Sequence, residues 1–388
     1  MAAYSVSVGC VFAPQRRKRP YFPFCFGDFD MKIVHVVETW IGGVANYVRA
    51  LMIEQRNMGH EIVLLCDPRN LKLADIGVDG IAVVHYRSSR NPVLIPAIAY
   101  RLKNVLADMN ADVIHCHSTF PGLYVRLNRF GNEKILYTPH AWSFMKRDIP
   151  TAMRHAFAFV ERALSNRCTR ILCMSFDEVR AARRHRIGLH NIVLVYTGIA
   201  SDTLSERSIE AAALAVSPAT TIHIGYFGRL DYQKGFDILL NAIPLLREGL
   251  HVHVFGTAVR GGVNLRSDDP RVTYHGWVGP DETRRAMLQM DVIVVPSRWE
   301  GLALVPIEAM RAGKVLIVSS EGSLPEQVIH GYNGLMLREL SGACLADQLN
   351  ALSLEECRRM GANARHVFDH AFRADRFFKS LMSCYENA

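Results

Sequence analysis

Short apolar runs alternate with helical patterns along most of this chain, and this alternation constrains the fold more than any other feature. The first set of strand-like runs is KIVHVVE (32–38), EIVLLCD (61–67), IAVVHY (81–86), ADVIHCH (111–117), KILYTPH (134–140), RILCMS (170–175) and NIVLVYTG (191–198). The second set is TIHIGYFG (221–228), HVHVFG (251–256), RVTYHGW (271–277), DVIVVPS (291–297) and KVLIVSS (314–320). Strands that alternate with helices form parallel sheets covered on both faces. The sequence therefore predicts an α/β fold with two Rossmann-like, doubly wound domains.

The segments outside these two sets suggest where the domains begin and end. Residues 1–30 contain RRKR and show no clear periodicity, so we expect an N-terminal extension, with Met31 as the true start. Residues 201–220 are polar and alanine-rich with a Ser-Pro step near their end, which is typical of a linker. The predicted organisation is an extension at 1–30, a first domain at 31–200, a linker at 201–220, a second domain at 221–370 and a closing helical segment at 371–388.

Composition describes a globular protein in a reducing compartment. The chain has 388 residues, of which 49% are hydrophobic and 21% charged, enough for two domains with real cores. No apolar run has the length needed to span a bilayer. The nine cysteines are odd in number and scattered, which favours free thiols and a cytoplasmic location.

Two short patterns mimic metal sites without the surroundings of one. Asp28-Phe29-Asp30 matches a metal-binding D-x-D pattern but lies outside any βα unit. His115-Cys116-His117 ends a strand-like run and has no second group of ligands nearby, so we expect it to pack at the strand end and line a site. We therefore expect neither a metal ion nor a cofactor.

Charge is divided unevenly between the halves. Residues 1–200 hold 26 Lys and Arg against 15 Asp and Glu, a net +11, and the remainder of the stated +8 leaves −3 for residues 201–388. Basic residues interleaved with apolar ones are concentrated in 145–186. This pattern fits a solvated helix face, or attraction to an anionic membrane surface or a lipid-phosphate acceptor. No recognised nucleic-acid-binding module is present, so nucleic acid is not an expected partner.

Residues 291–313 predict a buried strand, a loop and a short helix. Pro306 suits the first helical turn and Gly313 the helix end, so the backbone N–H groups of Leu302, Ala303, Leu304 and Val305 should point out of a helix N-terminus at the carboxyl end of a strand. Such a place binds anions, and ligands of open α/β sheets bind at this edge. The acids Glu300 and Glu308 flank it and can hold hydroxyl groups on either side of a phosphate. This arrangement indicates a sugar-nucleotide site.

A second segment, IGYFGRLDYQKG (224–235), supplies two cations between glycines. Arg229 and Lys234 lie between Gly228 and Gly235, five residues apart and just after a strand, so both can reach one diphosphate. Arginine bridges two oxygens, lysine acts as a point charge, and together they can replace a divalent metal.

These segments resemble, in order, the motifs of the retaining glycosyltransferases of family 4, the glycogen-synthase-like group. The matching stretches are VVETWIGGVANYVRAL (36–51), IGYFGRLDYQKG (224–235), the two acids of 300–308, and EGSLPEQVIHGYNGLML (321–337). The resemblance spans residues 31–388 and implies a GT-B fold, in which two domains face each other across a cleft and a last helix crosses back to the first. It implies a metal-independent hexosyltransferase that retains anomeric configuration.

Roles for individual residues follow from the same resemblance. It implies that Arg229 and Lys234 stabilise the leaving diphosphate, that Glu308 binds the ribose, and that Glu300 and His140 contact the donor sugar. Gly42 and Gly43 would let backbone approach the diphosphate or the acceptor, or they form a simple tight turn. Trp142, close to His140, lines a pocket or belongs to the core.

Some positions depart from the family pattern. Thr197-Gly198-Ile199-Ala200 stands where N-G-[VI]-D is usual, Ala303 replaces a glycine and Lys314 replaces a proline. These changes bear on donor identity more than on catalysis.

The expected function is transfer of a sugar from a UDP- or GDP-linked donor to a growing, lipid-linked glycan. The setting would be surface polysaccharide biosynthesis (exopolysaccharide, capsule or lipopolysaccharide), at the inner face of the cytoplasmic membrane. The alternative is a non-catalytic subunit that binds a nucleotide sugar or glycan in a synthesis complex. A phosphorylase or a sugar-nucleotide epimerase on the same scaffold is the other enzyme class considered.

Overall fold

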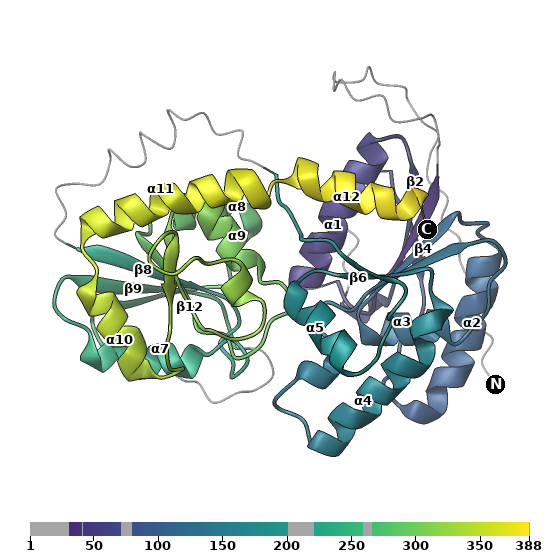
Figure 1. Cartoon of the computed structure of the whole chain (residues 1–388), viewed down its shortest axis with the longest axis horizontal. Coiled ribbons are helices and arrows are strands. Elements are labelled where there is room, and N and C mark those ends of the chain that lie inside the picture. The colour runs from purple at the N-terminus through teal and green to yellow at the C-terminus, as the bar shows by residue number, and fades with distance from the viewer. Residues whose placement is uncertain (1–30, 41, 71–79, 201–220, 259–265, 388) are drawn as a thin grey trace.

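The computed structural model describes residues 31–40, 42–70, 80–200, 221–258 and 266–387. The expectations for residues 1–30 and for the linker at 201–220 lie outside these ranges. The described chain forms two α/β domains, each built on one parallel sheet (Figure 1). The predicted fold class is therefore confirmed.

The first domain contains a seven-stranded sheet in the order β3-β2-β1-β4-β5-β6-β7. Its strands are β1 (Lys32–Val36), β2 (Glu61–Cys66), β3 (Ala82–His85), β4 (Val113–His117), β5 (Lys134–Thr138), β6 (Arg170–Cys173) and β7 (Ile192–Leu194). His35 of β1 lies opposite His115 of β4, and His117 lies opposite Thr138 of β5. Because side chains alternate between faces along a strand, His35, His115 and His117 lie on the same face.

Helices cover both faces of this sheet. The face that carries these histidines packs against α1 (Gly42–Asn57) and α12 (Ala374–Glu386), through apolar side chains such as Leu51 and Leu381. The opposite face packs against α2 (Ile95–Ala107), α3 (Thr119–Arg126), α4 (Thr151–Leu164) and α5 (Phe176–Arg184). Short 3-10 helices lie at η1 (Pro68–Asn70), η3 (Pro92–Leu94), η4 (Ser143–Met145) and η5 (Ser165–Arg167).

The second domain contains a six-stranded sheet in the order β10-β9-β8-β11-β12-β13. Its strands are β8 (Ile222–Phe227), β9 (Leu250–Phe255), β10 (Val272–Gly276), β11 (Val292–Val295), β12 (Val315–Val318) and β13 (Gly334–Met336). Its helices are α7 (Phe236–Ala242), α8 (Pro280–Leu288), α9 (Leu304–Arg311), α10 (Gly342–Ala351) and α11 (Leu354–Ala371), with η6 (Ile243–Leu245) and η7 (Leu324–Glu326). α7 and α10 pack on one face, and α8 and α9 on the other.

The C-terminal segment returns to the first domain as α12. We expected a closing helical segment at 371–388, and the chain breaks between α11 and α12, where Arg373 is extended (Figure 1). There the backbone pairs with the end of the first domain instead: Ile199 N donates to Phe372 O (3.0 Å) and Ala374 N donates to Ile199 O (2.9 Å). These bonds replace helical ones, which is why a single helix cannot continue.

The last helix is tied to the first domain by polar and aromatic contacts. The Phe377 ring lies 5.7 Å from that of Tyr47, and Lys134 Nζ donates to Tyr385 O and Glu386 O. Within the described ranges, no helix combines the length and hydropathy needed to cross a bilayer.

Candidate functional site

A pocket opens at the carboxyl ends of β8 and β11 in the second domain. The strand order reverses between these two neighbouring strands, and crevices at such points are where open α/β sheets bind ligands. The lining residues are Tyr226, Phe227, Lys234, Val294, Val295, Ser297, Ala303, Leu304 and Val305. Ser297 is fully buried, and its Oγ has no hydrogen-bond partner among the described residues. A buried hydroxyl without a partner is costly, so its place in this lining indicates a ligand contact that sequence inspection missed.

The loop from Gly228 to Gly235 shapes one side of this pocket. Tyr226 donates its hydroxyl to Arg229 O (2.7 Å), and Asp231 accepts from Lys234 N (2.9 Å), which holds the loop in a tight turn. Gly235 has a φ of +66°, and a Cβ there would lie 1.9 Å from the carbonyl oxygen of Pro296. Only glycine lets this loop pack against the loop that follows β11.

This packing brings Lys234 and Glu300 together. Lys234 Nζ lies 2.6 Å from Glu300 Oε1, and the Glu300 side chain is only 8% exposed. Arg229 is more exposed; it forms an ion pair with Asp231 (3.2 Å) and donates to Gln233 Oε1 (2.7 Å). Lys234 therefore faces the pocket, whereas Arg229 lies on the same loop outside its lining.

The start of α9 forms the opposite side of the pocket. Ala303 precedes the helix and gives no side-chain cap, and no acceptor among the described residues takes the N–H groups of Ala303, Leu304 and Val305. These free donors point out of a helix N-terminus into the lining, which is the requirement for an anion site. Leu302 is buried immediately before them.

Glu308 lies farther along α9. It is half-buried, and its carboxylate forms no hydrogen bond with any residue that the structure describes. Burial raises its pKa, and Arg311 opposes this rise. A buried acid without a hydrogen bond is available to a ligand hydroxyl.

The first domain contributes His140, whose backbone lies against Gly301, the residue after Glu300. His140 and Ala141 both adopt positive φ, 51° and 71°, which is uncommon for residues with a side chain. A Cβ at Gly301 would lie 2.6 Å from Ala141 N and 3.1 Å from the His140 carbonyl carbon. Because Gly301 has no side chain, the loop between β11 and α9 of the second domain can contact the His140–Ala141 turn of the first domain.

Glu178 of α5 holds this strained turn. Its carboxylate accepts from Ala141 N (2.6 Å) and Met174 N (2.7 Å). Burial raises the pKa of Glu178 to about 7, although both backbone hydrogen bonds act to lower it. Sequence inspection missed Glu178, and the only local signal is the Ser175 cap that precedes it.

Histidines lie behind His140. His140 Nε2 lies 3.1 Å from His117 Nδ1, and the Tyr47 ring meets His140 edge-on at 4.9 Å. Burial lowers the pKa of His140 to about 3 and that of His117 well below its usual value. Trp142 is fully buried and donates to Glu178 O, so it belongs to the core.

Gly42 and Gly43 lie at the start of α1, after β1 of the first sheet. Gly42 has a φ of +75°, and a Cβ at either position would have no heavy atom within 4 Å. The backbone is therefore open here, with room for a ligand or for a side chain.

A third missed residue, Glu326 of η7, joins the domains. Its carboxylate accepts from Phe176 N and Asp177 N at the start of α5 (both 2.7 Å) and from the Tyr196 hydroxyl (2.8 Å). Glu326 lies within the 321–337 motif, but its partners are about 130 to 150 residues away, which no local pattern reveals.

Comparison with known proteins agrees with this arrangement. The model of Glycosyltransferase Family 4 matches residues 41–203, and that of Glycosyl transferases group 1 matches residues 221–354. A Klebsiella pneumoniae protein described as an uncharacterized 41.2 kDa protein in the cps region is 26% identical over 92% of this chain and 100% of its own length.

Solved structures share the fold. Sucrose-phosphate synthase from Thermosynechococcus elongatus superposes with a TM-score of 0.76 at 20% identity, covering 92% of this chain and 98% of its own. Anabaena HepE in complex with UDP gives a TM-score of 0.77 at 17% identity, covering 92% and 100%. Each domain matches a glycosyltransferase family model, and the solved structures have the same two-domain architecture. The chain is therefore a glycosyltransferase of the GT-B type.

Proposed function

We propose that this protein transfers a hexosyl group from a nucleotide sugar to a glycan acceptor with retention of anomeric configuration. The observation that carries the proposal is the Lys234–Glu300 pair, which lies between the free N–H groups of α9 and the His140 turn. Lys234 and the N-terminus of α9 would bind the diphosphate, and Glu300 would bind the sugar attached to it.

The chemistry divides among these groups. The bond between the anomeric carbon and the diphosphate oxygen breaks as the acceptor hydroxyl attacks from the same face, and the hydroxyl proton passes to the leaving phosphate. Lys234 and Arg229 stabilise the charge that grows on this phosphate, helped by the N–H groups of Leu304 and Val305. Glu308 binds the ribose. Glu300 and His140 hold the sugar.

This assignment leaves no role that requires a divalent metal, because two cations and a helix N-terminus supply the positive charge. Transfer should therefore persist in excess EDTA. Loss of transfer that added Mg²⁺ or Mn²⁺ restores would overturn this part of the proposal.

The donor in this proposal is a UDP- or GDP-linked sugar. The fold neighbour HepE is described in complex with UDP and with UDP-glucose, which supports a uridine donor by analogy. The relative in the cps region supports a role in surface polysaccharide biosynthesis.

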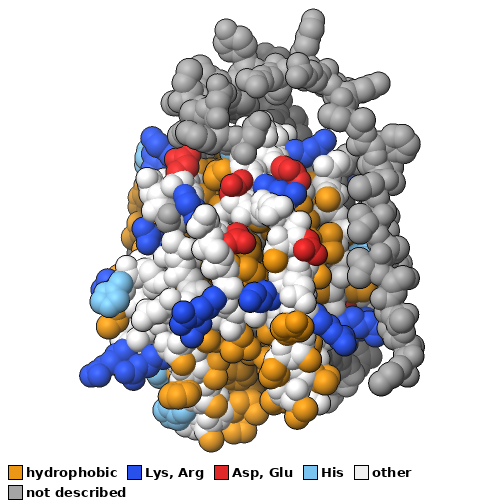
Figure 2. Space-filling model, turned by 90° about the vertical axis from the view of Figure 1, so that its right-hand side faces the viewer, with side chains coloured by type: hydrophobic (Ala, Val, Ile, Leu, Met, Phe, Trp, Pro, Cys, Tyr) orange, Lys and Arg blue, Asp and Glu red, His pale blue; other side chains and the backbone are white. Residues whose placement is uncertain are grey.

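The acceptor in this proposal is a lipid-linked glycan at the cytoplasmic face of a membrane. Hydrophobic side chains gather on the lower part of one face of the first domain, next to Lys and Arg side chains (Figure 2). α2 with η3 exposes Val93 (82%) and Tyr100 (66%), and α4 exposes Phe159 (73%). Both helices cover the same face of the sheet, and Lys103 and Arg162 are exposed on them. Apolar side chains beside basic ones are the surface that an anionic bilayer attracts.

The first test is whether the full chain binds a donor, measured as the thermal shift caused by UDP-, GDP- and ADP-sugars. A ligand that binds the folded state raises the melting temperature, and Lys234→Ala should abolish the rise. Arg358→Ala, an exposed change on α11, serves as the control. No shift with any donor would contradict the site.

Turnover then separates an enzyme from a binding subunit. The stabilising donor is incubated with lipid-linked acceptors, and mass spectrometry detects transfer. Transfer by the wild type that falls at least about 100-fold in Lys234→Ala supports catalysis. Binding with no transfer to any acceptor favours the non-catalytic subunit, and conversion of the donor without acceptor favours an epimerase.

A further inference from the structure

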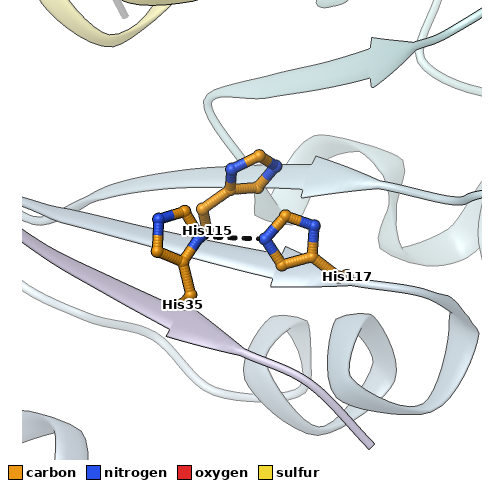
Figure 3. A group of neighbouring side chains, drawn as sticks. All are labelled: His35, His115 and His117. Carbon is orange, nitrogen blue, oxygen red and sulfur yellow. Dashed lines mark hydrogen bonds between the residues drawn. The ribbon is translucent and has the colours of Figure 1, made fainter. Parts of the chain in front are cut away.

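Four side chains of the first domain form a row of hydrogen bonds from α1 to the His140–Ala141 turn that contacts Gly301 of the second domain. Gln55 Oε1 lies 2.7 Å from His35 Nε2, and His35 Nδ1 lies 3.0 Å from His117 Nε2. His117 Nδ1 lies 3.1 Å from His140 Nε2. Figure 3 shows the link between His35 and His117, which project from adjacent strands toward each other. Gln55, His35 and His117 are fully buried, and His140 is half-exposed at the end of the row.

Elementary hydrogen-bond chemistry gives this row a direction. A neutral imidazole has one N–H and one lone pair, whereas an amide oxygen can only accept. Because Gln55 Oε1 accepts, His35 carries its proton on Nε2 and accepts through Nδ1. His117 must then donate from Nε2 and accept through Nδ1, and His140 must donate from Nε2. Among the described residues, the one ring nitrogen of the row left without a hydrogen-bond partner is His140 Nδ1, which carries a lone pair.

The histidines of the row are neutral. An extra proton on His35 or His117 would place two N–H groups against each other inside the core. Burial lowers the pKa of His35 to about 4 and that of His140 to about 3, and the pKa of His117 also falls well below its usual value. One tautomer therefore persists over the physiological pH range.

The Gln55 amide has one further polar atom, Nε2, which is buried and forms no hydrogen bond with a described residue. Burial raises the pKa of Tyr385 well above its usual value, and the Gln55 side chain opposes this rise, so Tyr385 and Gln55 interact.

A metal site is the competing interpretation of this cluster. One ring nitrogen from each of His35, His115 and His117 lies within 4.8 Å of the others. However, both nitrogens of His115 are already bonded, to the Tyr385 hydroxyl (2.5 Å) and to Thr138 Oγ1 (2.8 Å). Both nitrogens of His35 and His117 are bonded within the row. A metal ion would have to break these hydrogen bonds, so the geometry fits a proton-ordered network.

We propose that Gln55, His35 and His117 are positioning residues that hold His140 in the Nε2–H tautomer, so that its Nδ1 accepts a hydrogen bond from a hydroxyl of the transferred sugar. The tautomer follows from the row alone. Only the identity of the hydroxyl rests on the glycosyl transfer proposed above.

The direct test is the tautomer of His140 in the full chain without donor. Long-range ¹H–¹⁵N spectra of ¹⁵N-histidine-labelled protein distinguish the two tautomers, and His140→Ala assigns the resonance. We expect Nε2–H in the wild type and a mixture in Gln55→Met, which keeps the size of the side chain but removes the acceptor. Gln55→Glu retains an acceptor and should restore Nε2–H.

Thr138→Val is the matched control. It removes a buried hydrogen bond to a histidine of the same cluster, but His115 is not in the row, so the His140 tautomer should not change. Nδ1–H in the wild type, or no change in Gln55→Met, would overturn the proposal. So would Nδ1–H in Gln55→Glu, because the amide would then have been the donor. Stoichiometric Zn²⁺ binding that shifts the His35 and His117 resonances would also overturn it.

Kinetics test the role of the ordered tautomer. Gln55→Met should lower kcat about three- to tenfold with less than a twofold change in donor KM, and Gln55→Glu should recover most of the loss. Donor analogues that each lack one hydroxyl should include one for which wild type and Gln55→Met have equal kcat. If the wild type has the expected tautomer but no transfer activity, the proposed function is refuted and the tautomer proposal is retained. If the wild type is active but has the opposite tautomer, the tautomer proposal is refuted and the proposed function is retained.

Discussion

Each domain carries a row of histidines that crosses neighbouring strands, and the two rows differ in where they end. In the second domain His223 Nδ1 lies 3.0 Å from His253 Nε2, and His253 Nδ1 lies 3.1 Å from His275 Nε2. These N–N distances match those of the first domain. Here, however, His223 and His253 are half-exposed and His275 is exposed.

The comparison shows that a row of imidazoles has one defined tautomer only when a group at one end of the row can act solely as a donor or solely as an acceptor. Among the described residues, the His223 ring is hydrogen-bonded to His253 and to no side chain that can only accept, and His275 is exposed to water. In the first domain Gln55 provides such an anchor inside the core, and the row ends beside Gly301 of the other domain. Burial and anchoring, more than the histidines themselves, distinguish the two regions.

The largest expected difference is in acid stability. His35, His115, His117 and His140 have folded-state pKa values lowered by burial, to about 4 for His35 and about 3 for His140, against 6.5 when unfolded. Their contribution is fully present above pH 6.5 and is lost as pH falls from there toward 4. Each group contributes a slope of up to about 1.4 kcal/mol per pH unit, so the total reaches several kcal/mol. Glu178, with its pKa raised to about 7, gains stability over part of the same range but is one group against four.

Hydrogen exchange at pH 7 and pH 5, corrected for intrinsic rates, checks this expectation. Strands β1 and β4 should lose protection before β8 and β9, because three histidines of the first domain are fully buried, whereas the second-domain row has one histidine whose pKa falls to about 4, His253, and none that is fully buried. Equal loss in both domains, or earlier loss in the second, would contradict the comparison.

The next largest expected difference is in turnover. His140→Ala and His275→Ala each remove the last histidine of a row. Loss of His140 should lower the rate of sugar transfer about 100-fold, which corresponds to about 2.7 kcal/mol, because it removes the proposed hydrogen bond to the sugar. His275→Ala should stay within about twofold of wild type. Initial rates with saturating donor measure both, and similar losses in the two variants would remove the distinction.

The smallest expected difference is in the free energy of unfolding at neutral pH. Tyr385→Phe leaves His115 Nδ1 buried without a partner and should cost about 1–2 kcal/mol. Thr273→Val removes the partner of His251 Nε2 (2.9 Å), but that bond is exposed and its loss should cost less than about 0.5 kcal/mol. Urea unfolding measures both, and an equal cost would mean that burial does not separate the two clusters.

Much of the fold could be predicted because buried parallel strands are nearly pure apolar runs. The runs at 32–38 and 314–320 contain β1 and β12, whereas β13 was not singled out because it has only three residues and begins with glycine. Contacts between strands were harder. Lys234 and Glu300 are 66 residues apart, and they meet only because β8 and β11 are neighbours.

The histidine row lay further beyond sequence reasoning. His35, His115 and His117 occupy alternate positions of two apolar strands, and this is a signal that could have placed them on one face. Their hydrogen bonds also depend on strand register and on where α1 carries Gln55. Glu178 and Glu326 act on backbone N–H groups of distant segments, which leaves no mark in the residue pattern.

The pairing of Ile199 with Phe372 and Ala374 has a mechanical consequence. The chain leaves the first domain at Ile199 and re-enters it at Ala374, and two backbone hydrogen bonds fasten these passages together. A Cβ at Gly198 would lie 2.4 Å from Arg373 O, so the two strands are in direct contact. Two segments that join the domains and are hydrogen-bonded to each other resist rotation of one domain about the axis that connects the two domains, but they can still bend together. Any rotation of one domain relative to the other should therefore bend both passages together near these residues.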